Sequence, residues 1–135
     1  MTSSPVTRPR FATACIVLGA LLMFAGVVLG AFGAHGLETR VTPRQLESFR
    51  TGVLYQQIHA LGLLLVGLVA RVSGTSRVLR AAAGLMVAGV LLFSGSIYAM
   101  TAGAPRWLGM VAPAGGLCFM AAWLLVALHA LRNRD

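Results

Sequence analysis

Residues 11–37 read FATACIVLGALLMFAGVVLGAFGAHGL and contain no charged side chain. Further uncharged runs cover residues 51–70, 81–105 and 107–131. An uncharged apolar run of about 18 or more residues is typical of a transmembrane helix, and about 20 residues cross the hydrocarbon core. Barrel strands would instead alternate in polarity over about 10 residues. The pattern therefore predicts an all-α fold, an integral membrane four-helix bundle.

The composition excludes an ordinary soluble domain. Only 10% of the 135 residues are charged, against about 25% in soluble domains. The net charge of +8 comes from 11 basic residues, all of them arginine. Such an excess would indicate nucleic-acid binding in a soluble protein, but these arginines fall in tails and short loops. As partners we expect the lipid bilayer with its anionic head groups, and no nucleic acid.

The arginines also predict the orientation of the chain. The two tails and the second loop carry more of them than the first and third loops, and basic loops stay in the cytoplasm. Both termini should therefore be cytoplasmic. We divide the chain into a disordered cytoplasmic tail at 1–10, a four-helix transmembrane domain at 11–131 and a cytoplasmic tail at 132–135. The expected spans are about 11–34, 51–70, 80–101 and 108–131.

Local motifs refine the helices. Thr42-Pro43-Arg44-Gln45 predicts a helix start, because Thr42 can cap, proline suits the first helical position and Gln45 completes a capping box. Residues 43–50 should then form a short amphipathic lead at the interface. Pro113 should kink the fourth helix or free a carbonyl group. Close helix packing is expected at three glycines of the first helix, Gly26, Gly30 and Gly33.

Polar residues inside a membrane helix are costly, so they are the candidates for function. With both termini inside, one set falls in the outer half of the membrane. It comprises His35, Tyr55, Gln56, His59, Ser94, Ser96, Tyr98 and Pro113. Tyr55, Gln56 and His59 should share one inward face of the second helix. The set predicts a polar pocket or a buried hydrogen-bond cluster, whereas His129 is expected at the opposite interface near lipid head groups.

Three interpretations of this set stay open. The side chains could satisfy one another between helices, form a site for a small molecule or ion, or hold a metal or haem between His35 and His59. No Asp or Glu lies in any span, and Ser94 or Ser96 lacks the third group that a catalytic triad needs. We therefore expect no enzyme activity, no catalytic residues and no cofactor.

Four motifs occur in order along the chain. They are GAFGAHG at 30–36, GVLYQQIH at 52–59, LFSGSIY at 92–98 and PAGG at 113–116. Together they resemble the YgdD/YwdK family of uncharacterised small bacterial membrane proteins, domain-of-unknown-function family four-two-three. The resemblance covers about residues 11–131 and implies a multi-pass protein of the bacterial plasma (inner) membrane. It implies no catalytic, cofactor or substrate assignment.

Three functional hypotheses follow. The first is a structural or interaction protein, such as an accessory subunit of a membrane complex, because small-residue faces are present and a catalytic set is missing. The second is a transporter or channel for a small solute or ion, working as a homo-oligomer through the outer-half polar set. The third is haem or metal binding by His35 and His59.

Overall fold

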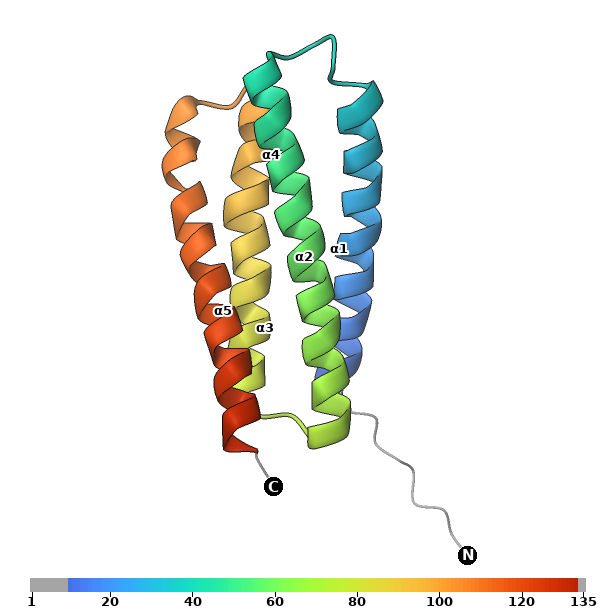
Figure 1. Cartoon of the computed structure of the whole chain (residues 1–135), viewed down its shortest axis with the longest axis vertical. Coiled ribbons are helices and arrows are strands. Elements are labelled where there is room, and N and C mark those ends of the chain that lie inside the picture. Colours follow the sequence, from blue (N-terminus) through green and yellow to red (C-terminus); the bar gives the residue numbers. More distant parts are fainter. Residues whose placement is uncertain (1–9, 134–135) are drawn as a thin grey trace, which may run out of the picture.

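The chain folds into long helices that run antiparallel to one another. The computed structural model describes residues 10–133, and all regular structure within them is helical. The elements are α1 (Arg10–His35), α2 (Pro43–Ser73), α3 (Arg77–Gly89), the π-helical η1 (Val90–Ser94), α4 (Gly95–Thr101), the 3₁₀-helical η2 (Arg106–Met110) and α5 (Ala112–Arg132). Figure 1 shows α1 beginning at the end of the bundle where α5 finishes.

Four helical stretches are long and apolar enough to cross a membrane: Arg10–His35, Pro43–Ser73, Arg77–Thr101 and Arg106–Arg132. The third combines α3, η1 and α4, and the fourth combines η2 and α5. The prediction of an all-α protein with four membrane-length helices is confirmed. Of the expected tails, residues 1–9 and 134–135 lie outside the described residues, while Arg10 and Arg132 are helical.

The start of α2 follows the predicted capping box. The Thr42 hydroxyl accepts a hydrogen bond from the Gln45 backbone N–H at 3.3 Å, and the Thr42 N–H donates to Gln45 Oε1 at 3.0 Å. These two bonds satisfy amide groups that the first helical turn leaves without partners. The lead at 43–50 and the second span form one continuous helix.

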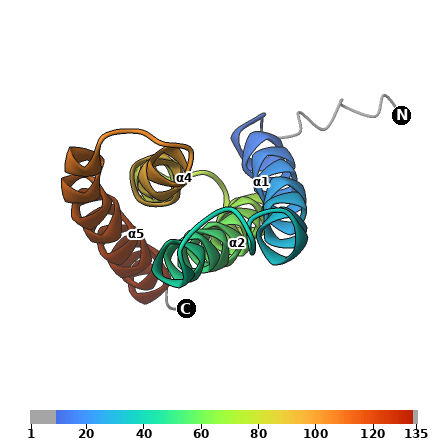
Figure 2. The ribbon, with the colours of Figure 1, turned by 90° about the horizontal axis from the view of Figure 1, so that it is seen from above.

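The helices pack as two pairs. α1 packs along α2, α3 packs along α5, and α2 joins the pairs through contacts with α3, η1 and α4. Seen from above in Figure 2, α1 lies at one edge of the bundle and α2 lies between it and the other helices. α2 therefore has neighbours on several sides, and the direction in which a side chain leaves α2 decides which helix it meets.

Buried glycines spaced seven residues apart form the seam between α1 and α2. A Cβ atom added to Gly19 would lie 2.8 Å from the Ala60 carbonyl oxygen, and one on Gly26 would lie 2.8 Å from Gln57 Cγ. One on Gly33 would lie 3.0 Å from the Phe49 ring. Gly30 has more room, 3.6 Å. The closest approaches thus follow a seven-residue spacing, and Gly30 is not among them.

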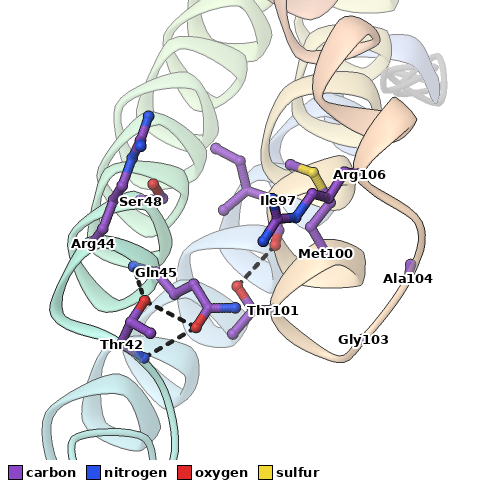
Figure 3. Close-up of a pocket in the computed structure, with 10 residues that line it drawn as sticks. All are labelled: Thr42, Arg44, Gln45, Ser48, Ile97, Met100, Thr101, Gly103, Ala104 and Arg106. Atoms are coloured by element: carbon purple, nitrogen blue, oxygen red, sulfur yellow. Dashed lines mark hydrogen bonds between the residues drawn. The ribbon is translucent and has the colours of Figure 1, made fainter.

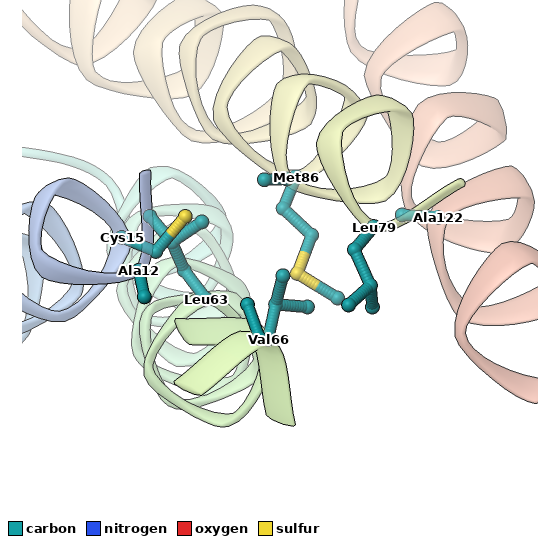
Figure 4. Close-up of a cluster of buried hydrophobic side chains, with 9 residues drawn as sticks. Ala12, Cys15, Leu63, Val66, Leu79, Met86 and Ala122 are labelled. Atoms are coloured by element: carbon teal, nitrogen blue, oxygen red, sulfur yellow. The ribbon is translucent and has the colours of Figure 1, made fainter. Parts of the chain in front are cut away.

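Two clusters of buried apolar side chains lie toward the two ends of the bundle, and the level of Gln56 and His59 lies between them. The cluster nearer the chain ends, drawn in Figure 4, contains Ala12, Cys15, Leu63, Val66, Ala70, Leu79, Ala83, Met86 and Ala122. Most of these side chains are small, so the helices approach closely there. The cluster at the opposite end contains Leu37, Leu46, Phe49 and Val53.

The fourth span differs from the prediction at Pro113. The proline occupies the first turn of α5, which begins at Ala112 after the separate turn η2. Proline costs nothing there, because the first amides of a helix have no partner inside it. The fourth span is therefore irregular just before Pro113, at the change from η2 to α5, while α5 itself is continuous from Ala112 to Arg132. The third span contains a second irregularity that we had not expected, where η1 inserts a π-helical turn at Val90–Ser94.

Candidate functional site

One part of the predicted polar set forms a closed hydrogen-bonded junction. Gln56 Nε2 donates to the Leu22 carbonyl oxygen of α1 at 2.8 Å, and the Tyr98 hydroxyl of α4 donates to Gln56 Oε1 at 2.8 Å. Ser94 Oγ donates to the Gly52 carbonyl oxygen of α2 at 2.7 Å. Gln56 and Ser94 are buried. These bonds tie α1, α2, η1 and α4 together at one level.

Ser96 does not join this junction. Its hydroxyl donates to the Phe93 carbonyl oxygen at 2.9 Å, within its own helical segment. This local bond satisfies a carbonyl group at the π-helical turn, where the regular i to i−4 pattern is interrupted. Ser96 therefore forms a hydrogen bond within its own helical segment, at η1, and makes no hydrogen bond to another helix within residues 10–133.

Tyr55 and His59 point toward α5 and η1, away from the junction. The imidazole of His59 stacks on the Phe119 ring with centroids 3.4 Å apart and planes 11° apart. Tyr55 meets the Phe93 ring at 4.7 Å, and Trp123 lies 6.0 Å from the imidazole. The Phe119 ring reaches this position because it lies over Gly89, where a Cβ atom would overlap it.

A cavity of about 680 Å³ lies along this aromatic face, between α2 and α5. Its volume is within the range of roughly 300–1,000 Å³ of small-molecule sites. We call it the α2–α5 groove, and its lining residues are Tyr55, Ile58, His59, Phe93, Pro113, Gly116, Leu117, Phe119, Met120 and Trp123. Three of the predicted residues, Tyr55, His59 and Pro113, therefore meet in one groove.

The two nitrogens of His59 differ in their partners. Nδ1 lies 2.6 Å from the Tyr55 carbonyl oxygen. A carbonyl oxygen only accepts, so Nδ1 carries the hydrogen and Nε2 of the neutral ring carries a lone pair. Nε2 makes no hydrogen bond to the described residues. Every fully enclosed side-chain nitrogen or oxygen among these residues has a hydrogen-bond partner, so Nε2 is not fully enclosed. Nε2 therefore keeps access to the groove although the His59 side chain is only 3% exposed.

His35 lies far from Gln56 and His59. It is the exposed last residue of α1, whereas Gln56, one turn before His59, bonds Leu22 on α1. The 13 residues from Leu22 to His35 correspond to roughly 20 Å along the helix. The structure thus does not bring His35 and His59 together as the metal or haem hypothesis requires. Within the described residues, no three His, Cys, Asp or Glu side chains lie close enough to share a metal ion.

A second cavity, of about 700 Å³, lies at the end of the bundle where α2 begins and α4 ends (Figure 3). It is lined by Thr42, Arg44, Gln45, Ser48, Ile97, Met100, Thr101, Gly103, Ala104 and Arg106. Arg106 extends toward α2 in Figure 3, while Arg44 runs along α2. The lining contains two arginines and no carboxylate.

His129, which we expected beside lipid head groups, is turned inward at the other end of the bundle. It is buried, with Ser76 Oγ 3.2 Å from Nδ1 and Ser73 Oγ 3.3 Å from Nε2. The prediction that this side chain lies beside lipid head groups is wrong, because the end of α2 and the N-cap of α3 supply hydroxyl partners within the bundle. The chain pattern contained a signal for this, since two serines flank the turn Gly74-Thr75.

Sequence reasoning also missed the aromatic walls of the groove. Phe93, Phe119 and Trp123 were not candidates, although Phe119 and Trp123 are four residues apart and so share one face of α5. The aromatic pair on one helical face was the signal that could have found them.

The comparisons with known proteins agree with the fold. A family model described as "Protein of unknown function (DUF423)" matches residues 29–116. The UPF0382 membrane protein YwdK of Bacillus subtilis is 42% identical over 118 residues, covering 87% of this chain and 95% of the relative. A UPF0382 membrane protein of Staphylococcus haemolyticus is 39% identical, covering 87% of this chain and 94% of the relative.

A more distant relative, the UPF0382 membrane protein of Haemophilus influenzae, is 34% identical over 120 residues, covering 89% of this chain and 95% of the relative. No solved structure matches the chain. The whole predicted polar set lies within residues 29–116, whereas Phe119 and Trp123 follow that range. With its four membrane-length helices, the chain belongs to the DUF423 family of membrane proteins of unknown function, the family named UPF0382 in its relatives.

Proposed function

We propose that this chain is a structural or interaction protein of the bacterial plasma (inner) membrane, acting as an accessory subunit of a larger membrane complex. The observation that carries the proposal is the closed junction around Gln56. Its amide nitrogen and oxygen and the hydroxyls of Ser94 and Tyr98 are all taken up by bonds between helices. Such bonds fix how helices sit against one another, which suits a scaffold.

The same junction favours the hypothesis of a structural protein over the hypotheses of a channel or an enzyme. A conduction path needs polar groups that remain available to the solute, whereas the Gln56, Ser94 and Tyr98 side chains bond one another or the backbone. The uncharged runs at 11–37, 51–70, 81–105 and 107–131 also contain no Asp or Glu that could move a proton. In this proposal the chain catalyses no reaction.

We propose further that both termini face the cytoplasm. The first and last described helical residues lie at the same end of the bundle (Figure 1), which an even number of spans requires. The larger arginine count at that end favours the cytoplasmic side. Arg44 and Arg106 at the opposite end would then lie at the outer surface, where anionic head groups or a partner can meet them.

Solubilisation in a mild detergent tests the accessory role. A chain carrying a C-terminal affinity tag should be purified from membranes in which it is made at its natural level. A defined partner should co-purify in constant ratio, and loosening the junction with Gln56→Leu should reduce that ratio. Recovery of this chain alone, from several detergents and from native lipid discs, would contradict the proposal.

A further inference from the structure

The α2–α5 groove has the features of a ligand site that the accessory role does not use. We propose that it binds a membrane-dissolved amphiphile with a flat ring and a hydroxyl group, of the phenol or quinol class. In this site His59 Nε2 accepts the hydrogen bond of the ligand hydroxyl. The proposal rests on the shape of the groove, the state of His59 and the way in which the groove opens.

The walls of the groove suit a flat ring. Aromatic side chains reach it from three elements, with Tyr55 on α2, Phe93 on η1, and Phe119 and Trp123 on α5. The Tyr55 ring is tilted against both Phe93 and Phe119, at 4.7 Å and 6.1 Å. Aromatic rings favour such offset and tilted neighbours, so a planar ligand ring can join the set without a new polar contact.

His59 gives the groove one directional polar atom. The Tyr55 carbonyl oxygen, 2.6 Å from Nδ1, holds the hydrogen on that nitrogen. Nε2 can then only accept, so it selects a ligand that donates. An acceptor without a partner is costly at membrane depth, and a ligand hydroxyl removes that cost. A quinol offers the donor, whereas the quinone with the same ring and tail offers only carbonyl oxygens.

The groove opens toward lipid. Ile58, Leu117 and Met120 line it and are exposed on the outside of the bundle. These side chains are apolar, so the mouth suits a molecule that arrives through the bilayer and keeps an apolar tail along the rim. A water-soluble ligand would meet no polar path at this mouth.

Gly116 marks free space inside the site. A Cβ atom added to Gly116 would meet no heavy atom within 4 Å, although the residue lines the groove. A side chain added at this position therefore begins in open space, with neither His59 nor any other part of the fold within 4 Å of its Cβ atom. Gly84 on α3 also has no neighbour within 4 Å and does not line the groove, which makes it the matched control.

Fluorescence of Trp123 tests the proposal on the purified full chain in lipid nanodiscs. Trp107→Phe leaves Trp123 as the reporter, and the probes are decyl-ubiquinol, kept reduced, and decyl-ubiquinone. We expect saturable quenching by the quinol with a dissociation constant about tenfold below that of the quinone, the effect of one hydrogen bond. Gly116→Leu should weaken the binding of both probes at least about tenfold, and Gly84→Leu should change neither.

His59→Phe keeps an aromatic ring against Phe119 and removes the acceptor. It should bring the two dissociation constants to within about twofold of each other, mainly by weakening the quinol. If this variant does not fold, the effect of Gly116→Leu against Gly84→Leu still decides whether the groove is the site. Equal binding of quinol and quinone, linear quenching by both, or full binding in Gly116→Leu would overturn the proposal. The purified chain has no partner protein, so the result is independent of the accessory role.

Discussion

Gln56 and His59 lie three residues apart on α2, yet they behave in opposite ways. Both are buried, and both stand in the middle of a membrane-length helix. Gln56 has a partner for its amide nitrogen and another for its oxygen, on α1 and α4. His59 bonds through Nδ1 alone and presents Nε2 to the α2–α5 groove. Of two buried polar residues on the same helix, one can therefore join neighbouring helices, while the other keeps an acceptor atom available beside a groove.

The reason for the difference is the arrangement of neighbours around α2. Residues three positions apart on a helix differ by about 60° in direction. On the side of Gln56, the glycine seam brings α1 so close that its backbone becomes a hydrogen-bond partner. On the side of His59, the α2–α5 groove separates α2 from α5, and aromatic rings fill part of this space.

Replacing a glycine by leucine on each side of α2, at Gly19 in the α1–α2 seam and at Gly116 in the α2–α5 groove, should give the largest difference in the free energy of unfolding. Gly19→Leu places its side chain against the Ala60 carbonyl oxygen, a backbone atom only 2.8 Å from the new Cβ. We expect a loss of about 3 kcal/mol in the free energy of unfolding, as for strong overpacking. Gly116→Leu should lose less than about 0.5 kcal/mol. Unfolding in mixed micelles with increasing SDS measures both, and equal losses would contradict the difference between the two sides.

Removing the Gln56 amide should have the next largest effect. Gln56→Leu deletes the bonds to Leu22 and Tyr98 while keeping an apolar volume. Bonds between membrane helices contribute about 0.6 kcal/mol on average and up to about 1.7 each. We expect a loss of about 1–2 kcal/mol in the same unfolding measurement. A value indistinguishable from the parent would show that the junction does not stabilise the bundle.

Removing a single hydrogen bond of the junction should lower the free energy of unfolding by less than Gln56→Leu does. Tyr98→Phe removes only the hydroxyl that donates to Gln56 Oε1. A loss of about 0.6 kcal/mol is expected. Combined with Gln56→Leu in a double-mutant cycle, the two changes should be non-additive because they share this bond. Full additivity would mean that the two side chains act independently.

The smallest effect on stability should come from His59. His59→Phe keeps the ring against Phe119 and loses the bond from Nδ1 to the Tyr55 carbonyl oxygen. That oxygen also accepts from the helix backbone, so the loss should stay under about 0.5 kcal/mol. A loss as large as that of Gln56→Leu would make His59 a structural residue and would erase the contrast.

The sequence alone was enough to predict the parts of the fold that depend on local pattern. The four membrane-length helices follow from uncharged runs, and the start of α2 follows from Thr42 and Gln45. The polar candidates included Gln56, Ser94 and Tyr98, which do bond between helices or to the backbone of a neighbouring helix. These features need no knowledge of how the helices are rotated against one another.

The division of the polar set could not be predicted in the same way. We placed Tyr55, Gln56 and His59 on one inward face, but the structure directs Gln56 to α1 and α4 and the other two to η1 and α5. The direction depends on the rotation of α2 in the bundle, and the π-helical turn at Val90–Ser94 changes the direction of the residues around it. Both are properties of packing between helices.

Nitrogen NMR of His59 tests the contrast between its two nitrogens most directly. The spectrum of ¹⁵N-histidine-labelled protein in lipid nanodiscs, with His59 assigned by its loss in His59→Phe, reports which ring nitrogen carries a hydrogen. The structure predicts a hydrogen on Nδ1 and a lone pair on Nε2, with the Nε2 signal moving when decyl-ubiquinol is added and staying unchanged with Gly116→Leu. A hydrogen on Nε2 in the ligand-free protein would contradict the assignment of His59 as an open acceptor.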